Sequence, residues 1–184
     1  MKLRVTQFAR ATGETPATVR NALTAGNDPR YPGADDFTGG GHRLFGWHDA
    51  IAWRLTRQLT ETGLTWAQAS EVVRETYAAR QAEKLPNEGR LAFLAVWGSV
   101  TQAGATTGAE TGLTSWIGPA SEVGRVVTLD AASDATGAGM FTGLSCVRMV
   151  SIHRAIQTAK LLARRAGYGV YDGHLVALDM ERAE

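Results

Sequence analysis

The sequence predicts two domains, a mainly helical one over residues 1–85 and a small α+β domain over residues 90–184. Three observations support this division. The first part contains several helix caps followed by apolar residues spaced three and four apart. The run Pro86-Asn87-Glu88-Gly89 is typical of a linker. Beyond it, short apolar runs alternate with loops rich in alanine, glycine and serine, and one amphipathic helix follows.

Composition limits the classes of function. Hydrophobic residues make up 44% of the 184 residues and charged residues 20%, as in ordinary globular proteins. The first sixty residues contain eight Lys/Arg and five Asp/Glu, whereas residues 90–184 contain eight of each. Cys146 is the single cysteine, which excludes an intramolecular disulfide and a thiolate metal cluster. The N-terminus lacks the apolar segment of a signal peptide, and no apolar run approaches the roughly 20 residues that cross a bilayer. We therefore expect a cytoplasmic protein with no membrane contact.

Two short helices are predicted at the N-terminus. Thr6 is the expected cap of the first, which ends at Gly13, where glycine readily adopts a left-handed conformation. Thr15 is the expected cap of the second, with Pro16 at its first position. Val19 and Leu23 lie on one face of this second helix. Two such helices joined by a tight turn form a helix-turn-helix.

The next segment predicts a hairpin followed by two further helices. Residues 26–41 are rich in glycine, proline and aspartate, and they lead into the short extended run His42-Arg43-Leu44-Phe45. This pattern is typical of a glycine-rich hairpin with a basic tip. The following helix has Asp49 in its first turn and ends at Gly63. Thr65 caps another helix, which stops by Pro86.

Residues 90–184 predict short strands and one helix. The expected strands cover residues 91–96, 123–129, 144–150 and 175–178, and the expected loops cover 102–112 and 130–139. Ser151 caps the expected helix, which Gly167 closes.

The N-terminal segments resemble MerR-family regulators. Val5-Thr6-Gln7-Phe8-Ala9-Arg10-Ala11-Thr12-Gly13 resembles their opening helix, and Thr15-Pro16-Ala17-Thr18-Val19-Arg20 the start of their recognition helix. Gly41-His42-Arg43-Leu44-Phe45 is similar to the family's wing, usually Gly-Tyr-Arg-Leu-Tyr. The resemblance extends over residues 3–73.

The resemblance implies a winged helix-turn-helix whose second helix enters the major groove of double-stranded DNA. Thr18, Arg20 and Arg43 match family positions that contact DNA. Asn21 stands where the family usually has an aromatic residue, and His42 replaces the wing tyrosine. The candidate DNA-binding residues are Thr15, Thr18, Arg20, Asn21, His42 and Arg43.

Two departures from the family bear on function. The long dimerisation helix that normally follows the winged domain is cut off at Pro86, and the cysteines of metal-sensing members are absent. We therefore expect no metal and no cofactor, and we expect residues 90–184 to form the homodimer and to hold any small-molecule effector. No nucleophile, phosphate-loop or dinucleotide motif is found, which predicts a non-enzyme.

The expected function is a dimeric transcriptional regulator that represses its targets. A phage-type DNA-binding protein, either an excisionase or a small terminase subunit, is an alternative. A ligand- or protein-binding adaptor that has lost DNA binding is another.

Overall fold

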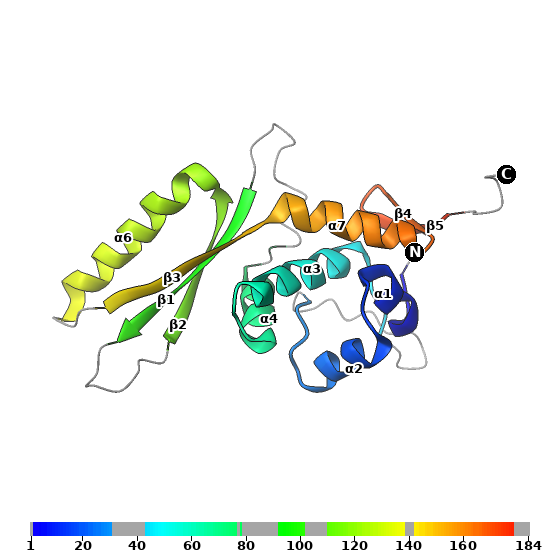
Figure 1. Ribbon diagram of the computed structural model, residues 1–184, viewed down its shortest axis with the longest axis horizontal. Helices are drawn as coiled ribbons and strands as arrows, with labels where there is room; N and C mark the ends of the chain where they lie inside the picture. The colour runs from blue at the N-terminus through cyan, green and yellow to red at the C-terminus, as the bar shows by residue number, and fades with distance from the viewer. Residues whose placement is uncertain are drawn as a thin grey trace.

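A computed structural model describes residues 2–30, 43–76, 78, 92–101, 110–138 and 142–178. The architecture is a mixed α+β arrangement with small antiparallel sheets, as the sequence predicts at that level (Figure 1). The helices are α1 (Val5–Thr12), α2 (Pro16–Thr24), α3 (Trp47–Glu61), α4 (Trp66–Glu75), α6 (Ala120–Ala138) and α7 (Ile152–Arg165). The strands are β1 (Ala92–Thr101), β2 (Glu110–Pro119), β3 (Thr142–Ser151), β4 (Tyr168–Tyr171) and β5 (His174–Ala177).

The helix ends follow the predicted caps with one exception. Thr15, Thr65 and Ser151 each accept a hydrogen bond from a backbone N–H in the first turn of the helix that follows. Gly13 ends α1 with a φ of 73°. The prediction that Thr6 caps α1 is wrong, because the helix begins at Val5. The Arg4 backbone N–H donates to the Gln7 side chain (3.0 Å), which fixes the earlier start.

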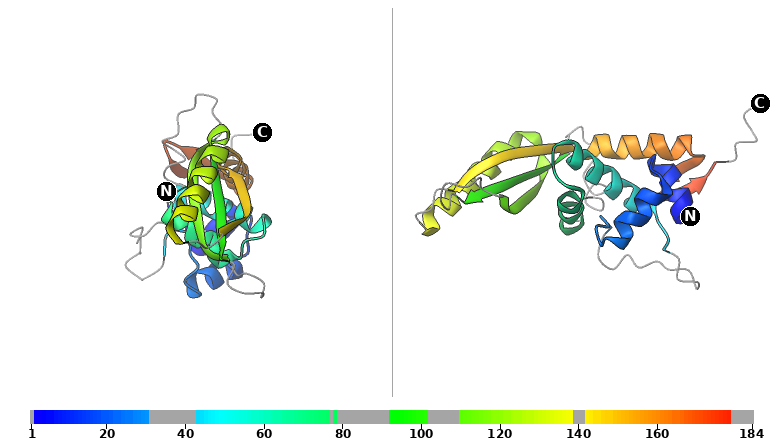
Figure 2. Two further views of the ribbon diagram at one scale, coloured as in Figure 1. Left: turned by 90° about the vertical axis from the view of Figure 1, so that its left-hand side faces the viewer. Right: turned by 60° about the horizontal axis from the view of Figure 1, so that its bottom comes forward.

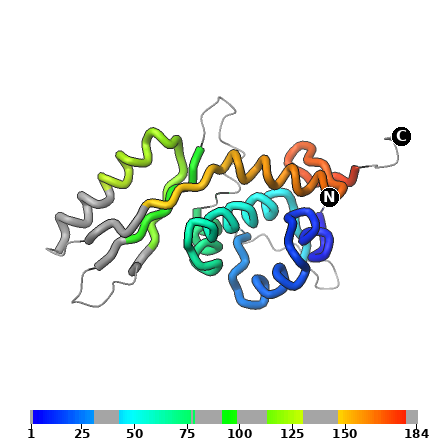
Figure 3. The backbone as a smooth tube through the Cα atoms, viewed as in Figure 1, coloured from blue at the N-terminus to red at the C-terminus, as the bar shows by residue number. Residues whose placement is uncertain are grey.

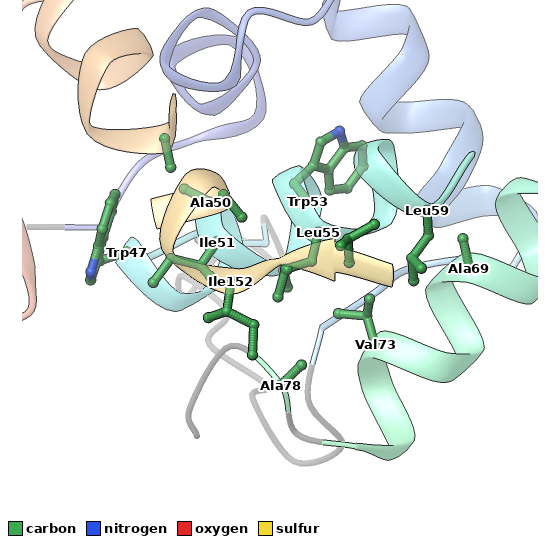
Figure 4. Packing of buried hydrophobic residues seen from close by; sticks show 14 of the residues in the cluster. Trp47, Ala50, Ile51, Trp53, Leu55, Leu59, Ala69, Val73, Ala78 and Ile152 are labelled. Carbon is green, nitrogen blue, oxygen red and sulfur yellow. The ribbon is translucent and has the colours of Figure 1, made fainter. Parts of the chain in front are cut away.

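Helices α1 to α4, helix α7 and the hairpin of β4 and β5 pack around one core, and we call them the helical body; Leu94 and Val96 of β1 and Val150 of β3 pack on the same core. The buried residues include Phe8 of α1, Trp53 of α3, Ile152 of α7 and Leu175 of β5. Figure 4 shows Ile152 in the same cluster as α3 side chains. The sequence places helix α7 in the part at residues 90–184, but the helix packs against α1 and α3 of the part at residues 1–85.

Strands β1, β2 and β3 with helix α6 form a second unit, which we call the sheet module. The strand order is β2-β1-β3, with both neighbours antiparallel to β1. Helix α6 connects the two outer strands across one face of the sheet (Figures 1 and 2). The chain enters this module after α4 and leaves it directly into α7 (Figure 3).

The prediction of a strand at residues 123–129 and of a loop at 130–139 is wrong, because α6 covers residues 120–138. Val123, Val126 and Val127 are spaced three and four apart and pack on Trp97 and Trp116 of the sheet. The valines suggested a strand because β-branched side chains favour extended backbone. Tertiary burial of their helical face outweighs that preference.

Three other expectations have different outcomes. The strands predicted at 91–96, 144–150 and 175–178 are confirmed as β1, β3 and β5. The loop predicted at 102–112 is wrong for residues 110–112, which belong to β2. Strand β4 was not predicted; it pairs with β5 across the turn at Asp172 and Gly173, both of which have positive φ.

Candidate nucleic-acid interface

Helix α2 has a buried face and an exposed face. Val19 and Ala22 are buried in the core of the helical body. On the other side Thr15, Arg20 and Asn21 are exposed, and Thr18 is half-buried. Four of the six predicted contact residues therefore lie together on this helix, where three of them face solvent.

The start of α2 is fixed by threonine hydroxyls. Thr15 Oγ1 accepts from the Thr18 backbone N–H (3.1 Å) and lies 2.9 Å from Thr18 Oγ1. Pro16 at the first helical position has no N–H to leave unsatisfied. This bonding orients both hydroxyls at the helix end, where the positive end of the helix dipole favours anions.

Arg20 is the one cationic side chain on α2. Its guanidinium is exposed and makes no ion pair within the ranges that the structure describes. A guanidinium offers five N–H donors in a planar fork, which matches a phosphate or the edge of a guanine.

Arg43 lies outside α2, in an ion-pair cluster with Asp28. Its Nη1 lies 3.3 Å from Asp28 Oδ2, and its side chain is 36% exposed. Arg30 Nε donates to the same Asp28 oxygen (2.6 Å), and the Arg30 guanidinium lies 5.2 Å from the centre of the Phe45 ring. His42 lies outside the described residues.

The Asp28 cluster connects the segment after α2 to the strand that carries Arg43. Asp28 follows α2 by four residues, and Arg74 of α4 donates to its carbonyl oxygen (3.5 Å). Asn27, beside it, accepts a hydrogen bond from Trp66 Nε1 (3.0 Å). Sequence reasoning missed Asp28 and Arg30. The two opposite charges on either side of Pro29 indicate an ion pair between Asp28 and Arg30. They do not indicate that Arg43 also pairs with Asp28.

A backbone bridge brings a second basic segment beside Arg43. Leu3 and Phe45 exchange both backbone hydrogen bonds (2.7 and 2.9 Å) in an isolated antiparallel bridge. Lys2 and Arg4, the neighbours of Leu3, are exposed. The N-terminal basic residues are therefore held alongside the extended segment at residues 43–45.

Aromatic packing joins the segment at residues 43–45 to α1, α3 and α4. The Phe8 and Phe45 rings stack with centroids 4.3 Å apart, and Trp53 meets Phe8 edge-on at 5.5 Å. Trp66 lies 5.2 Å from Trp53. The strand, the first helix and the α3–α4 pair are thereby joined in one rigid cluster.

Asp49 is a half-buried residue in the first turn of α3. Burial raises its pKa to about 6, and the hydrogen bond from the Gly46 N–H (2.6 Å) and the nearby Arg30 charge offset part of that rise. The carboxyl accepts this bond at the first turn of α3, so it fixes the junction between strand and helix.

In the described part of the chain, neither a metal site nor a membrane-spanning helix is found. No three His, Cys, Asp or Glu side chains there come together as they would around a metal ion. None of its helices combines the length and the apolar character needed to cross a membrane.

Comparison with protein-family models and with curated proteins finds no match to this chain.

Proposed function

We propose that this protein binds duplex DNA with the exposed face of α2 in the major groove, as a winged helix-turn-helix of the MerR type. The observation that carries the proposal is that face: a hydroxyl-capped helix start followed by Asn21 and by Arg20, which has no ion-pair partner among the described residues. Their opposite side is anchored in the core through Val19 and Ala22. Arginine and asparagine are the commonest readers of guanine and adenine edges.

Arg43 contributes a contact to the DNA backbone in this proposal. Its ion pair with Asp28 holds the side chain in place. The side chain is 36% exposed, so a phosphate oxygen can approach the guanidinium from solvent. Such contacts set the register of a protein on DNA and do not read sequence.

The biological role that we propose is transcriptional regulation, with repression as its direction. One short recognition helix gives limited specificity, and two-fold pairing on a palindromic site is the usual remedy. We therefore propose a homodimer formed through residues 90–184, acting in the cytoplasm, with any small-molecule effector bound in the same part.

The test is selection of DNA by the full-length protein. Purified protein is incubated with fragments of its own genome, and the retained fragments are sequenced. We expect a few sites with two-fold symmetry. Arg20→Ala should weaken binding to them by about 5- to 150-fold, as the loss of 1–3 kcal/mol of base discrimination implies. Arg43→Ala should weaken binding to all sequences alike and reduce the salt dependence.

Arg125→Ala is the matched control, because Arg125 is an exposed arginine of α6 that already pairs with Glu122 (3.5 Å). Circular dichroism should show that all variants fold. Wild-type protein that enriches nothing, or Arg20→Ala protein that binds as tightly as wild type, would contradict DNA reading by α2. The adaptor alternative would then be favoured.

A further inference from the structure

The positive charge of the second half of the chain is concentrated on α7. This helix contains four basic residues and no acidic one, and no acidic residue occurs between Asp134 and Asp172. All four basic side chains are exposed, and none makes an ion pair within the described residues; they are Arg154, Lys160, Arg164 and Arg165. We call them the α7 basic face.

Helix stability alone does not explain this face. Arg164 and Arg165 in the last turn interact favourably with the helix dipole. Arg154 lies in the first turn, where a positive charge is disfavoured. Lys160 and Arg164 are four residues apart, so their like charges repel. A face that served only for solvation would normally mix charges of both signs.

The α7 basic face lies on the opposite side of the helical body from α2. Ile152, Ala155 and Ala159 line the buried side of α7, which packs on α1 and α3. Figures 1 and 2 show α2 on the far side of those two helices. A straight duplex seated on α2 therefore does not reach α7.

The chemistry of the face favours nucleic acid over a lipid surface. A helix that lies on a membrane needs a broad apolar face, and the apolar face of α7 is buried in the core. Leu161, 50% exposed, is the one large apolar side chain among the cations. From Arg154 to Arg165 the helix rises about 16 Å at 1.5 Å per residue, enough to follow several phosphates of a duplex.

We propose that the α7 basic face binds the phosphate backbone of a second segment of duplex DNA, while α2 holds the first. The inference rests on the proposed function for the first segment. One chain would thereby bridge two duplex segments, with sequence read at α2 alone.

The experiment measures bridging by the full-length protein. A fluorescent 40-base-pair duplex and a biotinylated 40-base-pair duplex of unrelated mixed sequence are mixed with protein, and the fluorescence captured on streptavidin is recorded. Arg154→Gln/Lys160→Gln removes the two charges that the helix dipole does not explain. Arg57→Gln/Arg125→Gln is the matched control, because it also removes two exposed charges, each beside a carboxylate of Glu14 or Glu122.

We expect the α7 variant to lose at least tenfold in bridging and to keep its binding to the first duplex within about twofold. The control variant should match wild type in both. For the second duplex, the slope of log K against log salt should fall by about two in the α7 variant, at about 0.9 per phosphate contact. A homodimer could also bridge two duplexes through its two copies of α2. Bridging by Arg20→Ala protein is therefore measured together with bridging by the α7 variant.

The outcomes separate the two proposals. Unchanged bridging in the α7 variant overturns the inference and leaves the proposed function standing, as does wild-type protein that binds one duplex without bridging. Binding that depends on α7 but not on Arg20 overturns both DNA reading by α2 and the assignment of α7 to a second segment. Loss of binding to phosphatidylserine vesicles in the α7 variant, with unchanged DNA binding, also overturns the inference.

Discussion

At the residue scale, Asp49 makes stability depend on pH in the opposite direction from most carboxyls. Burial raises its folded pKa to about 6, whereas the unfolded value is 3.8. Between these values the folded protein holds a proton that the unfolded chain has released, so the free energy of unfolding falls as pH rises. At about 1.4 kcal/mol per pKa unit, the loss contributed by this group is about 3 kcal/mol by pH 7.

The variant Asp49→Asn tests this directly. The amide oxygen still accepts from the Gly46 N–H, but it carries no charge to bury. We expect the free energy of unfolding of wild type, minus that of Asp49→Asn, to decrease between pH 4 and pH 7 in urea titrations. Asp49→Ala, which lacks the acceptor, should be less stable than Asp49→Asn at every pH. A difference that is flat with pH would rule out the raised pKa.

Thr15 has a structural role that can be separated from its proposed contact with DNA. Thr15→Ala removes the cap of α2 and should cost about 1 kcal/mol in unfolding free energy. Thr65→Ala removes the equivalent cap of α4 and should cost about the same. In a DNA-binding assay only the first should weaken the complex. Equal effects of both on binding would mean that Thr15 acts through stability alone.

At the element scale, Gly13 at the end of α1 lies close to Leu162 of α7. Its φ of 73° disfavours any side chain, and a Cβ there would lie 3.3 Å from Leu162 Cδ2. Gly26 has a similar φ of 71° with nothing within 4 Å of such an atom. Gly13→Ala and Gly26→Ala should therefore share a backbone cost of about 1 kcal/mol. Gly13→Ala should lose more, and Leu162→Ala in the same chain should reduce that excess. Equal losses of unfolding free energy in Gly13→Ala and Gly26→Ala would show that Leu162 of α7 moves aside without cost.

Elements with strong local signals could be predicted from sequence, and elements defined by long-range contacts could not. Hydroxyl caps identified α2, α4 and α7 because a cap acts within one turn. The valines of α6 suggested a strand because the two tryptophans that bury them lie on other segments. For the candidate site, the face of α2 followed from its spacing. The Asp28–Arg43 pair joins residues 15 positions apart, and no local pattern predicts it.

At the scale of the whole molecule, the helical body needs residues from both halves of the sequence. The later half supplies a set of fully or nearly buried side chains to its core, among them Val150, Ile152, Ala155, Ala159, Ala163 and Leu175. A chain ending at residue 90 would expose the surfaces of α1 and α3 that α7 covers.

We therefore expect the fragment 1–90 to unfold without a cooperative transition in urea. A synthetic peptide covering residues 150–178, added in excess, should restore cooperativity and raise the midpoint. A peptide of the same length covering residues 110–138, which contains β2 and α6, serves as the control. A fragment 1–90 as stable as the full chain would show that the N-terminal helices are independent of α7.

The sheet module begins and ends at neighbouring positions: Phe93 of β1 is paired with Ser151 of β3, directly before α7. Paired residues of antiparallel strands lie about 5 Å apart. In protein-engineering terms, the interval between them is an insertion site whose two ends are one strand spacing apart. A foreign domain with termini at that spacing can replace the module only if it also replaces the core contacts that Leu94, Val96 and Val150 make with the helical body.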